Sequence, residues 1–276
     1  MGLENFIPEI WHSAVLVPLR KNLVHAALVN REYEKELKFG DTLRLSEIGA
    51  VAVNSYTKNG SISWENLDSA QKSLLIDQQD YFAVKLDDID KVQSNVDLMA
   101  SFGAEASYTM SDTIDQHLAG LYTGAGNSVS ALTVTAGNVL KNLSNMQLEL
   151  DEASVPTGGR YIIIPPWYNQ HLVLAASGAV SATATVKTMD NGLLVNGYVG
   201  QLFGFNILMS NNVNNNGSVW NIMAFNRSAI THASQIAKVE ATRIEDSFAD
   251  GVKGLYLYGS KVVRPNAMVS CAATKG

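Results

Sequence analysis

Cysteine is almost absent from this sequence, which contains only Cys271. One cysteine cannot form a disulfide within the chain, and zinc sites built on several cysteines are excluded. The five histidines are scattered, and no two of them are four residues apart, so no zinc-binding pair can form on one face of a helix. The fold must therefore be held together by packing.

Basic residues are also too few for one class of function. The chain has 20 Lys and Arg against 26 Asp and Glu, for a formal net charge of -6. A protein that binds nucleic acid irrespective of sequence needs clustered Lys and Arg to neutralise phosphates. The composition disfavours such a function, and the protein is not expected to bind nearby DNA tightly.

Long apolar runs are missing as well. No segment approaches the ~18 apolar residues that a membrane-spanning helix needs, and Glu4 and Glu9 stand where a signal peptide would carry basic residues. We therefore expect a soluble protein that is made in the cytoplasm and has no membrane partner. A hydrophobic content of 46% is enough for a sizeable core and excludes a wholly disordered chain.

Motifs that carry chemistry are incomplete or absent. Gly254 to Lys261 has the glycine spacing of a phosphate-binding loop, but it ends in Ser-Lys instead of Lys-Ser/Thr and its interior alternates like a strand. Gly124 and Gly126 lack the third glycine of a dinucleotide fingerprint and follow a predicted helix. Cys271 lies in a strand-like run, where packing is expected and not nucleophilic chemistry. We assign no catalytic, cofactor-binding or metal-binding residue.

What the first third of the chain does contain is extended structure. Residues 1–37 are expected to form an irregular arm and a short helix, because prolines interrupt the pattern. Residues 41–48 and 74–86 are strand-like, and Asn59-Gly60 between them is a tight-turn signal. The pattern predicts a long two-stranded excursion with few partners of its own.

The strongest helix signal follows this excursion. Asp87 and Asp88 can cap the helix, and Gly124 and Gly126 can end it. Between them, apolar residues recur at every third or fourth position: Ile89, Val92, Val96, Met99, Phe102, Ala106, Met110, Ile114, Leu118 and Leu121. At 1.5 Å per residue the helix would be about 45 Å long and would cross the whole molecule.

The second half mixes helices and strands as in an α+β domain. Helices are predicted at residues 136–153 and 167–176. Strands are predicted at 160–164, around Asn191-Gly192 and at 205–209. Three further short strands, at 239–244, 254–264 and 266–273, are expected to form a small antiparallel sheet.

Negative charge is concentrated between Asp77 and Asp115, where nine acidic residues face only two basic ones. The remainder of the chain is close to neutral. Such a run usually marks a solvated helix face. The alternative is an acidic stripe that binds a positive surface on another copy.

The order of these parts resembles the major capsid proteins of tailed bacteriophages, which have the Hong Kong 97-like fold. Several segments are similar, more narrowly, to the branch related to the coat protein of Salmonella phage P22. They are FIPEIW (6–11), IDQQDYFAVKLDDIDKVQSN (76–95), ASVPTGGRYIIIPP (153–166), GFNILMSNNV (204–213), AFNRSAITHASQ (224–235) and YGSKVVRP (258–265). The resemblance covers nearly the whole chain.

The resemblance implies an α+β fold with five parts. These are an N-terminal arm (1–37), the E-loop hairpin (38–88), the spine helix of the P-domain (89–126), the A-domain (127–233) and strands that return to the P-domain (234–276). A two-stranded ribbon is marginal in water by itself. The E-loop is therefore expected to become ordered by lying across a neighbouring copy, over its acidic helix region.

The resemblance also implies a function and a set of partners. The chain would be a major capsid protein of the virion, whose copies form pentamers and hexamers that close an icosahedral shell around double-stranded DNA. A portal and a decoration protein are further expected partners. The arm is too short for the N-terminal scaffolding segment of some relatives, which implies a separate scaffolding protein or none, and the A-domain is too short for the inserted domain of the P22-type coat.

Some relatives cross-link covalently through Lys and Asn side chains. Lys58 beside Asn59 at the proposed loop tip and Asn266 in the tail are the residues to consider. An exposed lysine in a turn is the ordinary interpretation of Lys58.

Two other classes of function remain open at this stage. One is an enzyme of unknown reaction with a site assembled from distant residues such as His171, Asp190 and Ser210, and a cleft of titratable groups with shifted pKa values would favour it. The other is a secreted adhesion module, which the missing signal peptide disfavours.

Overall fold

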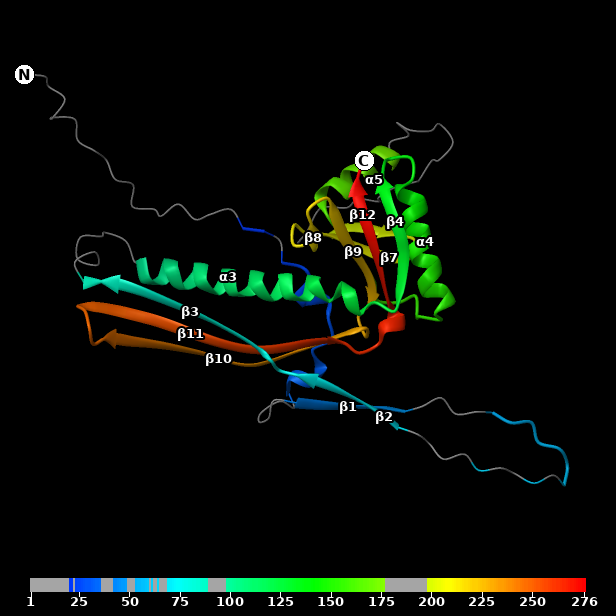
Figure 1. Ribbon diagram of the computed structural model, residues 1–276, viewed down its shortest axis with the longest axis horizontal. Coiled ribbons are helices and arrows are strands. Elements are labelled where there is room, and N and C mark those ends of the chain that lie inside the picture. Colours follow the sequence, from blue (N-terminus) through cyan, green and yellow to red (C-terminus); the bar gives the residue numbers. More distant parts are fainter. Residues whose placement is uncertain are drawn as a thin grey trace, which may run out of the picture.

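The computed structural model describes residues 20–21, 23–35, 42–48, 53–59, 61, 64, 69–88, 98–176 and 198–276. Figure 1 shows three parts: a body of sheet and helices, a long three-stranded ribbon that runs beside a helix, and a thin two-stranded ribbon that projects from the molecule.

The helices and strands have the following bounds. The α-helices are α1 (His25–Leu28), α3 (Leu98–Gly120), α4 (Val139–Glu152) and α5 (Pro166–Ala176), and the 3-10 helices are η2 (Glu32–Lys35), η3 (Leu121–Gly124) and η4 (Pro265–Ala267). The strands are β1 (Thr42–Ile48), β2 (Ser69–Leu75), β3 (Gln78–Asp87), β4 (Asn127–Val134), β5 (Arg160–Ile164), β6 (Tyr198–Leu202), β7 (Phe205–Met209), β8 (Asn215–Asn216), β9 (Val219–Asn226), β10 (Ile230–Ile244), β11 (Ala249–Val262) and β12 (Met268–Lys275).

The body is built on a seven-stranded mixed sheet with the order β4-β12-β9-β5-β7-β6, in which β8 pairs with β9. Its central strand β5 is a continuous apolar run, and Ile162, Ile163 and Ile164 are all buried. Helix α4 places Val139 and Met146 in the same core, at the helical spacing expected of a buried stripe. Each such fully buried side chain contributes roughly 1.5–3 kcal/mol.

The long ribbon is an antiparallel sheet with the order β10-β11-β3. Strands β10 and β11 pair from Ile230 and Val262 to the turn at residues 245–248. Helix α3 lies along this ribbon (Figure 1) and contacts it through the ring of His117, which meets the ring of Tyr258 edge-on at 5.3 Å.

The predicted long helix is confirmed from Leu98 to Gly120, and η3 carries the turn to Gly124, where the sequence predicted the stop. Its predicted start at residues 89–97 lies outside the described residues. The helices predicted near 136–153 and 167–176 and the strands at 160–164 and 205–209 are also confirmed. The strands expected around Asn191-Gly192 fall on residues that the structure does not describe.

The predicted small sheet of three closing strands is wrong in one respect. Strand β12 does not join β10 and β11, but lies between β4 and β9 in the body. Its side chains Met268, Val269 and Cys271 are fully buried, and since Met268 and Val269 point to opposite faces of the sheet, both faces are covered at this strand. The other two strands are longer than predicted and pair with each other, and β11 also pairs with β3.

Candidate assembly surfaces

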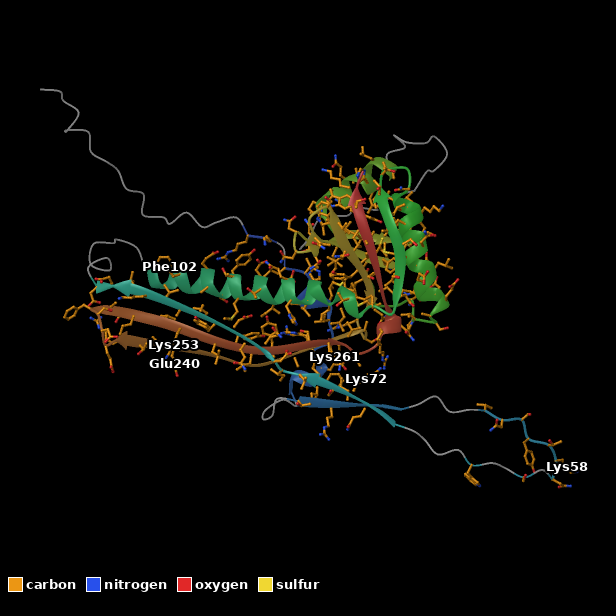
Figure 2. All side chains as sticks on the ribbon, viewed as in Figure 1. Lys58, Lys72, Phe102, Glu240, Lys253 and Lys261 are labelled. Atoms are coloured by element: carbon orange, nitrogen blue, oxygen red, sulfur yellow. The ribbon has the colours of Figure 1, made fainter. Side chains whose placement is uncertain are left out.

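The projecting ribbon is the most exposed part of the described chain. Strands β1 and β2 pair antiparallel in register from Thr42 and Leu75 to Ile48 and Ser69, so a two-stranded excursion is present as predicted. Its second strand was predicted at the wrong place, because most of residues 74–86 form β3, which pairs with β11 in the long ribbon. Beyond them the ribbon extends away from the body to Lys58 (Figure 2), and the predicted turn is present there. Asn59 has a φ of 69°, a left-handed conformation that asparagine adopts readily.

Large apolar side chains of the projecting ribbon face solvent. Val53 is 96% exposed, Tyr56 67% and Trp64 92%. Contiguous apolar surface on a monomer commonly marks a contact with another molecule. Nothing in the described part of the same chain covers these three side chains.

The base of the projecting ribbon is held firmly by the body. The Lys72 ammonium of β2 donates to the Val263 carbonyl at 2.8 Å, and the Lys261 ammonium of β11 donates to the Ser73 carbonyl at 2.7 Å (Figure 2). Leu74 is buried here in a small core that it forms with Ile76 and with Ala233 of β10. The anchored base contrasts with the unsupported tip.

One face of the long ribbon is also uncovered. Tyr81 on β3 and its cross-strand partner Leu255 on β11 are 78% and 44% exposed. They line a groove of about 490 Å³ beside Lys253, whose ammonium lies 3.4 Å from the carboxylate of Glu240 (Figure 2). The groove is a second surface on which another chain could pack.

The acidic residues of α3 are largely neutralised within the chain. Residues 20–21 and 23–25 lie beside the helix, where Arg20 pairs with Glu105 at 3.5 Å and Lys21 with Asp112 at 3.2 Å. His25 contacts Asp115 at 2.9 Å. This part of the acidic run is therefore neither a purely solvated face nor a free stripe, because the residues before α1 cover it.

Asp115 lies at the buried centre of a junction between α3, the start of α1 and the turn after β7. Its carboxylate is fully buried and accepts hydrogen bonds from the backbone N–H groups of His25 and Ala26, at 2.7 and 3.3 Å, and from His25 Nδ1. The amide of Asn212, in the turn after β7, donates to it at 3.1 Å. Burial alone would raise the pKa of Asp115, but the hydrogen bonds and the charge interaction with His25 outweigh it and lower the pKa.

Sequence reasoning did not find this junction. The partners of Asp115 lie about 90 residues away on one side and 97 on the other in the sequence. No local spacing indicates such pairs. The only available signal was the excess of carboxylates in the region, which required cations or donors from elsewhere.

The residues named for an enzyme hypothesis do not form a recognisable site. His171 on α5 packs edge-on against Trp167 at 6.0 Å, and neither of its ring nitrogens has a hydrogen-bond partner among the described residues. Ser210 is buried at the end of β7, and its hydroxyl accepts the backbone N–H of Asn212 at 3.1 Å. Asp190 lies outside the described residues.

Other chemical candidates are absorbed into the fold. The segment from Gly254 to Lys261 is part of β11, as its alternation predicted, and forms no phosphate-binding loop. Among the residues that the structure describes, no three His, Cys, Asp or Glu side chains gather where they could hold a metal ion. Within the same ranges no helix is long and apolar enough to cross a membrane.

Cys271 is packed, as predicted. It is fully buried, and the Asn142 side-chain amide donates to its sulfur at 3.3 Å. Burial raises the pKa of the thiol, although the hydrogen bond from Asn142 acts in the opposite direction.

A test of this packing follows from the raised pKa. At pH 8, Cys271 of the native protein is expected to react with a chromogenic disulfide reagent at least about 100-fold more slowly than Cys271 of urea-unfolded protein, because the thiol is shielded and protonated. A native rate close to the unfolded rate would contradict the buried position. The two rates are measured on the same preparation, so no variant is needed.

Comparison with known proteins identifies the family. A family model described as phage capsid protein matches residues 71–271. No curated protein matches the chain. Among solved structures, the chain is similar to one titled Mycobacterium phage Che8, with 31% identity, 98% of each chain covered and a TM-score of 0.83.

Two more distant structures support the fold. The capsid structure of cyanophage P-SCSP1u has 17% identity, with 100% of this chain and 95% of that chain covered and a TM-score of 0.80. The mature capsid of bacteriophage PhiM1 has 14% identity, with 97% and 92% covered and a TM-score of 0.74. These matches confirm the expected Hong Kong 97-like fold, while the narrower P22-related branch stays a prediction. The chain belongs to the phage capsid protein family, and it is a major capsid protein that forms the shell of a virion.

Proposed function

We propose that copies of this chain form pentamers and hexamers, that these close an icosahedral shell around double-stranded DNA, and that the projecting ribbon of each copy lies on a neighbouring copy. The observation that carries the proposal is the exposure of Val53, Tyr56 and Trp64 on a ribbon whose base is rigidly held. A two-stranded ribbon with uncovered apolar side chains is marginal unless another surface packs against it. A second copy provides such a surface in a shell.

In this proposal the parts of the chain keep the roles that the resemblance implies. Residues 38–88 are the E-loop, 89–126 the spine helix, 127–233 the A-domain and 234–276 the strands that return to the P-domain. The N-terminal arm comprises residues 1–37. The position of β12 within the body means that the last part also completes the sheet of the A-domain.

The remaining partners follow from the same proposal. A chain with a net charge of -6 can enclose DNA without binding it tightly, which suits packing and release of a genome. A separate scaffolding protein, a portal and a decoration protein are proposed partners, and the chain is proposed to be made in the host cytoplasm. Cross-linking through Lys58 and Asn266 is not proposed, because an exposed lysine in a turn needs no special role.

The family indicates a structural role and gives no support to the enzyme alternative. A cleft with several titratable groups of shifted pKa would have favoured that alternative. Among the groups with a shifted pKa, Cys271 and Tyr168 are buried in packing, and Asp115 is held in a junction between distant segments.

Replacing Trp64 with serine tests the proposal. The free subunit is expected to keep its thermal stability, because Trp64 is 92% exposed. Assembly is expected to weaken by about 2 kcal/mol or more per copy, the usual cost of removing a central aromatic side chain from an interface. Size-exclusion chromatography and negative-stain microscopy measure the fraction of chain in shells.

Leu148→Ser provides the matched control, since Leu148 is a 53% exposed apolar residue on α4, away from the projecting ribbon. Normal shells from Trp64→Ser would argue against the contact between ribbon and neighbour. A wild-type chain that stays monomeric at every salt concentration and with every scaffolding partner would refute the shell itself.

A further inference from the structure

A positively charged pocket lies where the projecting ribbon meets the body. Its volume is about 280 Å³, and its lining includes Lys72 of β2 and Arg264 just before η4 but no acidic residue. The Lys72 ammonium is already bound to the Val263 carbonyl. The guanidinium of Arg264 is exposed and makes no hydrogen bond or ion pair with any described residue.

The rest of the lining is mixed. Val155, Pro156, Pro265 and two alanines contribute an apolar part of the wall, and Ser154, Ser228 and Asn266 contribute polar groups. A free guanidinium beside an apolar wall suits a partner that carries both a carboxylate and an aromatic ring, because Arg binds carboxylates through two parallel hydrogen bonds.

The turn between β10 and β11, at residues 245–248, has that chemistry. Glu245 and Asp246 are exposed and make no ion pair with any residue that the structure describes, and Phe248 is 82% exposed. The backbone of the turn is fixed, since the Asp88 N–H donates to the Phe248 carbonyl at 3.0 Å. The turn therefore presents two carboxylates and one phenyl ring on a rigid support.

The turn and the pocket lie at opposite ends of β11. The strand runs from Ala249, next to the turn, to Val262, just before Arg264. Fourteen residues of strand span roughly 45 Å, and Figure 1 shows the turn far from η4. One chain cannot fill its own pocket, so the two features can meet only between copies, head to tail.

We propose that the turn at residues 245–248 of one copy docks in the Lys72/Arg264 pocket of the next copy. Arg264 pairs with Glu245 and Asp246, and Phe248 packs on the apolar wall. A contact between two different surfaces of the same chain propagates into rings or extended arrays, which a shell requires. The inference rests on the proposed shell and names a specific contact within it.

Charge reversal tests the pairing. Arg264→Glu, and separately the double variant Glu245→Arg with Asp246→Arg, are each expected to raise the concentration needed for assembly by about tenfold or more. Thermal unfolding of the free subunit should be unchanged, because none of these side chains has an intrachain partner among the described residues. Lys141→Glu, an equal change of charge at an exposed position on α4, is the control and should assemble as wild type does.

A triple variant combines Arg264→Glu with Glu245→Arg and Asp246→Arg. In it position 264 of the pocket is acidic and the turn is basic, so the two again carry opposite charges. It is expected to assemble at least about tenfold more readily than either parent variant. Failure of this rescue would overturn the proposal, as would normal assembly of Arg264→Glu.

Cysteine cross-linking gives an independent readout. The only native thiol, Cys271, is buried, so Phe248→Cys and Asn266→Cys introduce the only reactive thiols. Under oxidation, shells of the double variant should give a ladder of linked chains on a denaturing gel, because a disulfide needs Cα atoms within about 7 Å. Neither single variant should cross-link.

The outcomes separate the inference from the proposed function. Cross-linked dimers from Phe248→Cys alone would show that two turns meet each other, which would overturn the docking. Intact shells without a ladder from the double variant would also overturn it and leave the shell in place. Absence of shells from the wild-type chain would refute both.

Discussion

Replacing Asp115 with alanine is expected to lower the free energy of unfolding by about 3–5 kcal/mol, the usual cost of removing one partner from a buried ion pair. The carboxylate is fully buried and accepts bonds from His25, Ala26 and Asn212. Without it, donors from two distant parts of the chain, residues 25–26 and Asn212, are left unsatisfied in the interior. Urea unfolding of the purified subunit, followed by tryptophan fluorescence, measures the change.

The control for Asp115→Ala is Glu152→Ala, which removes an exposed carboxylate at the end of α4. It should change the free energy of unfolding by less than about 0.5 kcal/mol. A loss below 1 kcal/mol for Asp115→Ala would mean that the junction does not hold the arm to α3.

The same carboxylate makes stability depend on pH in acid. Because the folded pKa of Asp115 lies below its unfolded value of 3.8, its contribution is complete above that value and is lost as pH falls through the folded pKa. Asp115→Asn should therefore show a shallower loss of stability below about pH 4 than wild type, with the wild-type advantage largest near neutral pH. Parallel slopes for the two proteins would contradict the lowered pKa.

Replacing Gly259 with alanine is expected to destabilise the crossing between β11 and the base of the projecting ribbon by about 3 kcal/mol or more. A Cβ at this position would lie 2.0 Å from the Leu75 carbonyl oxygen, which belongs to the backbone and cannot rotate away. Strand β11 and the end of β2 would have to move apart. This movement would also lengthen the hydrogen bonds that the Lys72 and Lys261 ammonium groups donate between the ribbon and the body. Urea unfolding measures the loss, and limited proteolysis near Lys58 should become faster.

Gly103→Ala is the matched control for Gly259→Ala. Gly103 lies within α3, and nothing is within 4 Å of the Cβ that alanine would add. This variant should gain about 0.5–1 kcal/mol, because alanine favours a helix interior. Wild-type stability for Gly259→Ala would show that the crossing is looser than the structure indicates.

The sequence predicted elements whose signal is local. Helix α4 was recognised from the spacing of Val139, Leu143, Met146 and Leu150, and β5 from its apolar run between Arg160 and the following prolines. Strand β4 was not predicted, because its sequence NSVSALTV is rich in small and polar residues. Strand β9 was also missed, although it is largely buried.

Pairing over long distances was not predictable in the same way. The run that became β12 was recognised as a strand, but its neighbours β4 and β9 lie about 140 and 50 residues earlier. Alternation of side chains reports which face is buried and carries no information about the partner strand. The functional surfaces follow the same rule. The projecting ribbon has a local sequence signal and was expected. The Asp115 junction and the Arg264 pocket are formed by segments far apart in the sequence and were not predicted.

The position of β12 also bears on how the protein is synthesised. Residues 268–275 occupy the interior of the body's sheet, between a strand that begins at residue 127 and one that ends at residue 226. Until residues 268–275 leave the ribosome, the edges of β4 and β9 that will later be buried have no partner. A chain that stops before residue 268 thus lacks a closed body and exposes two strand edges that can pair with other chains.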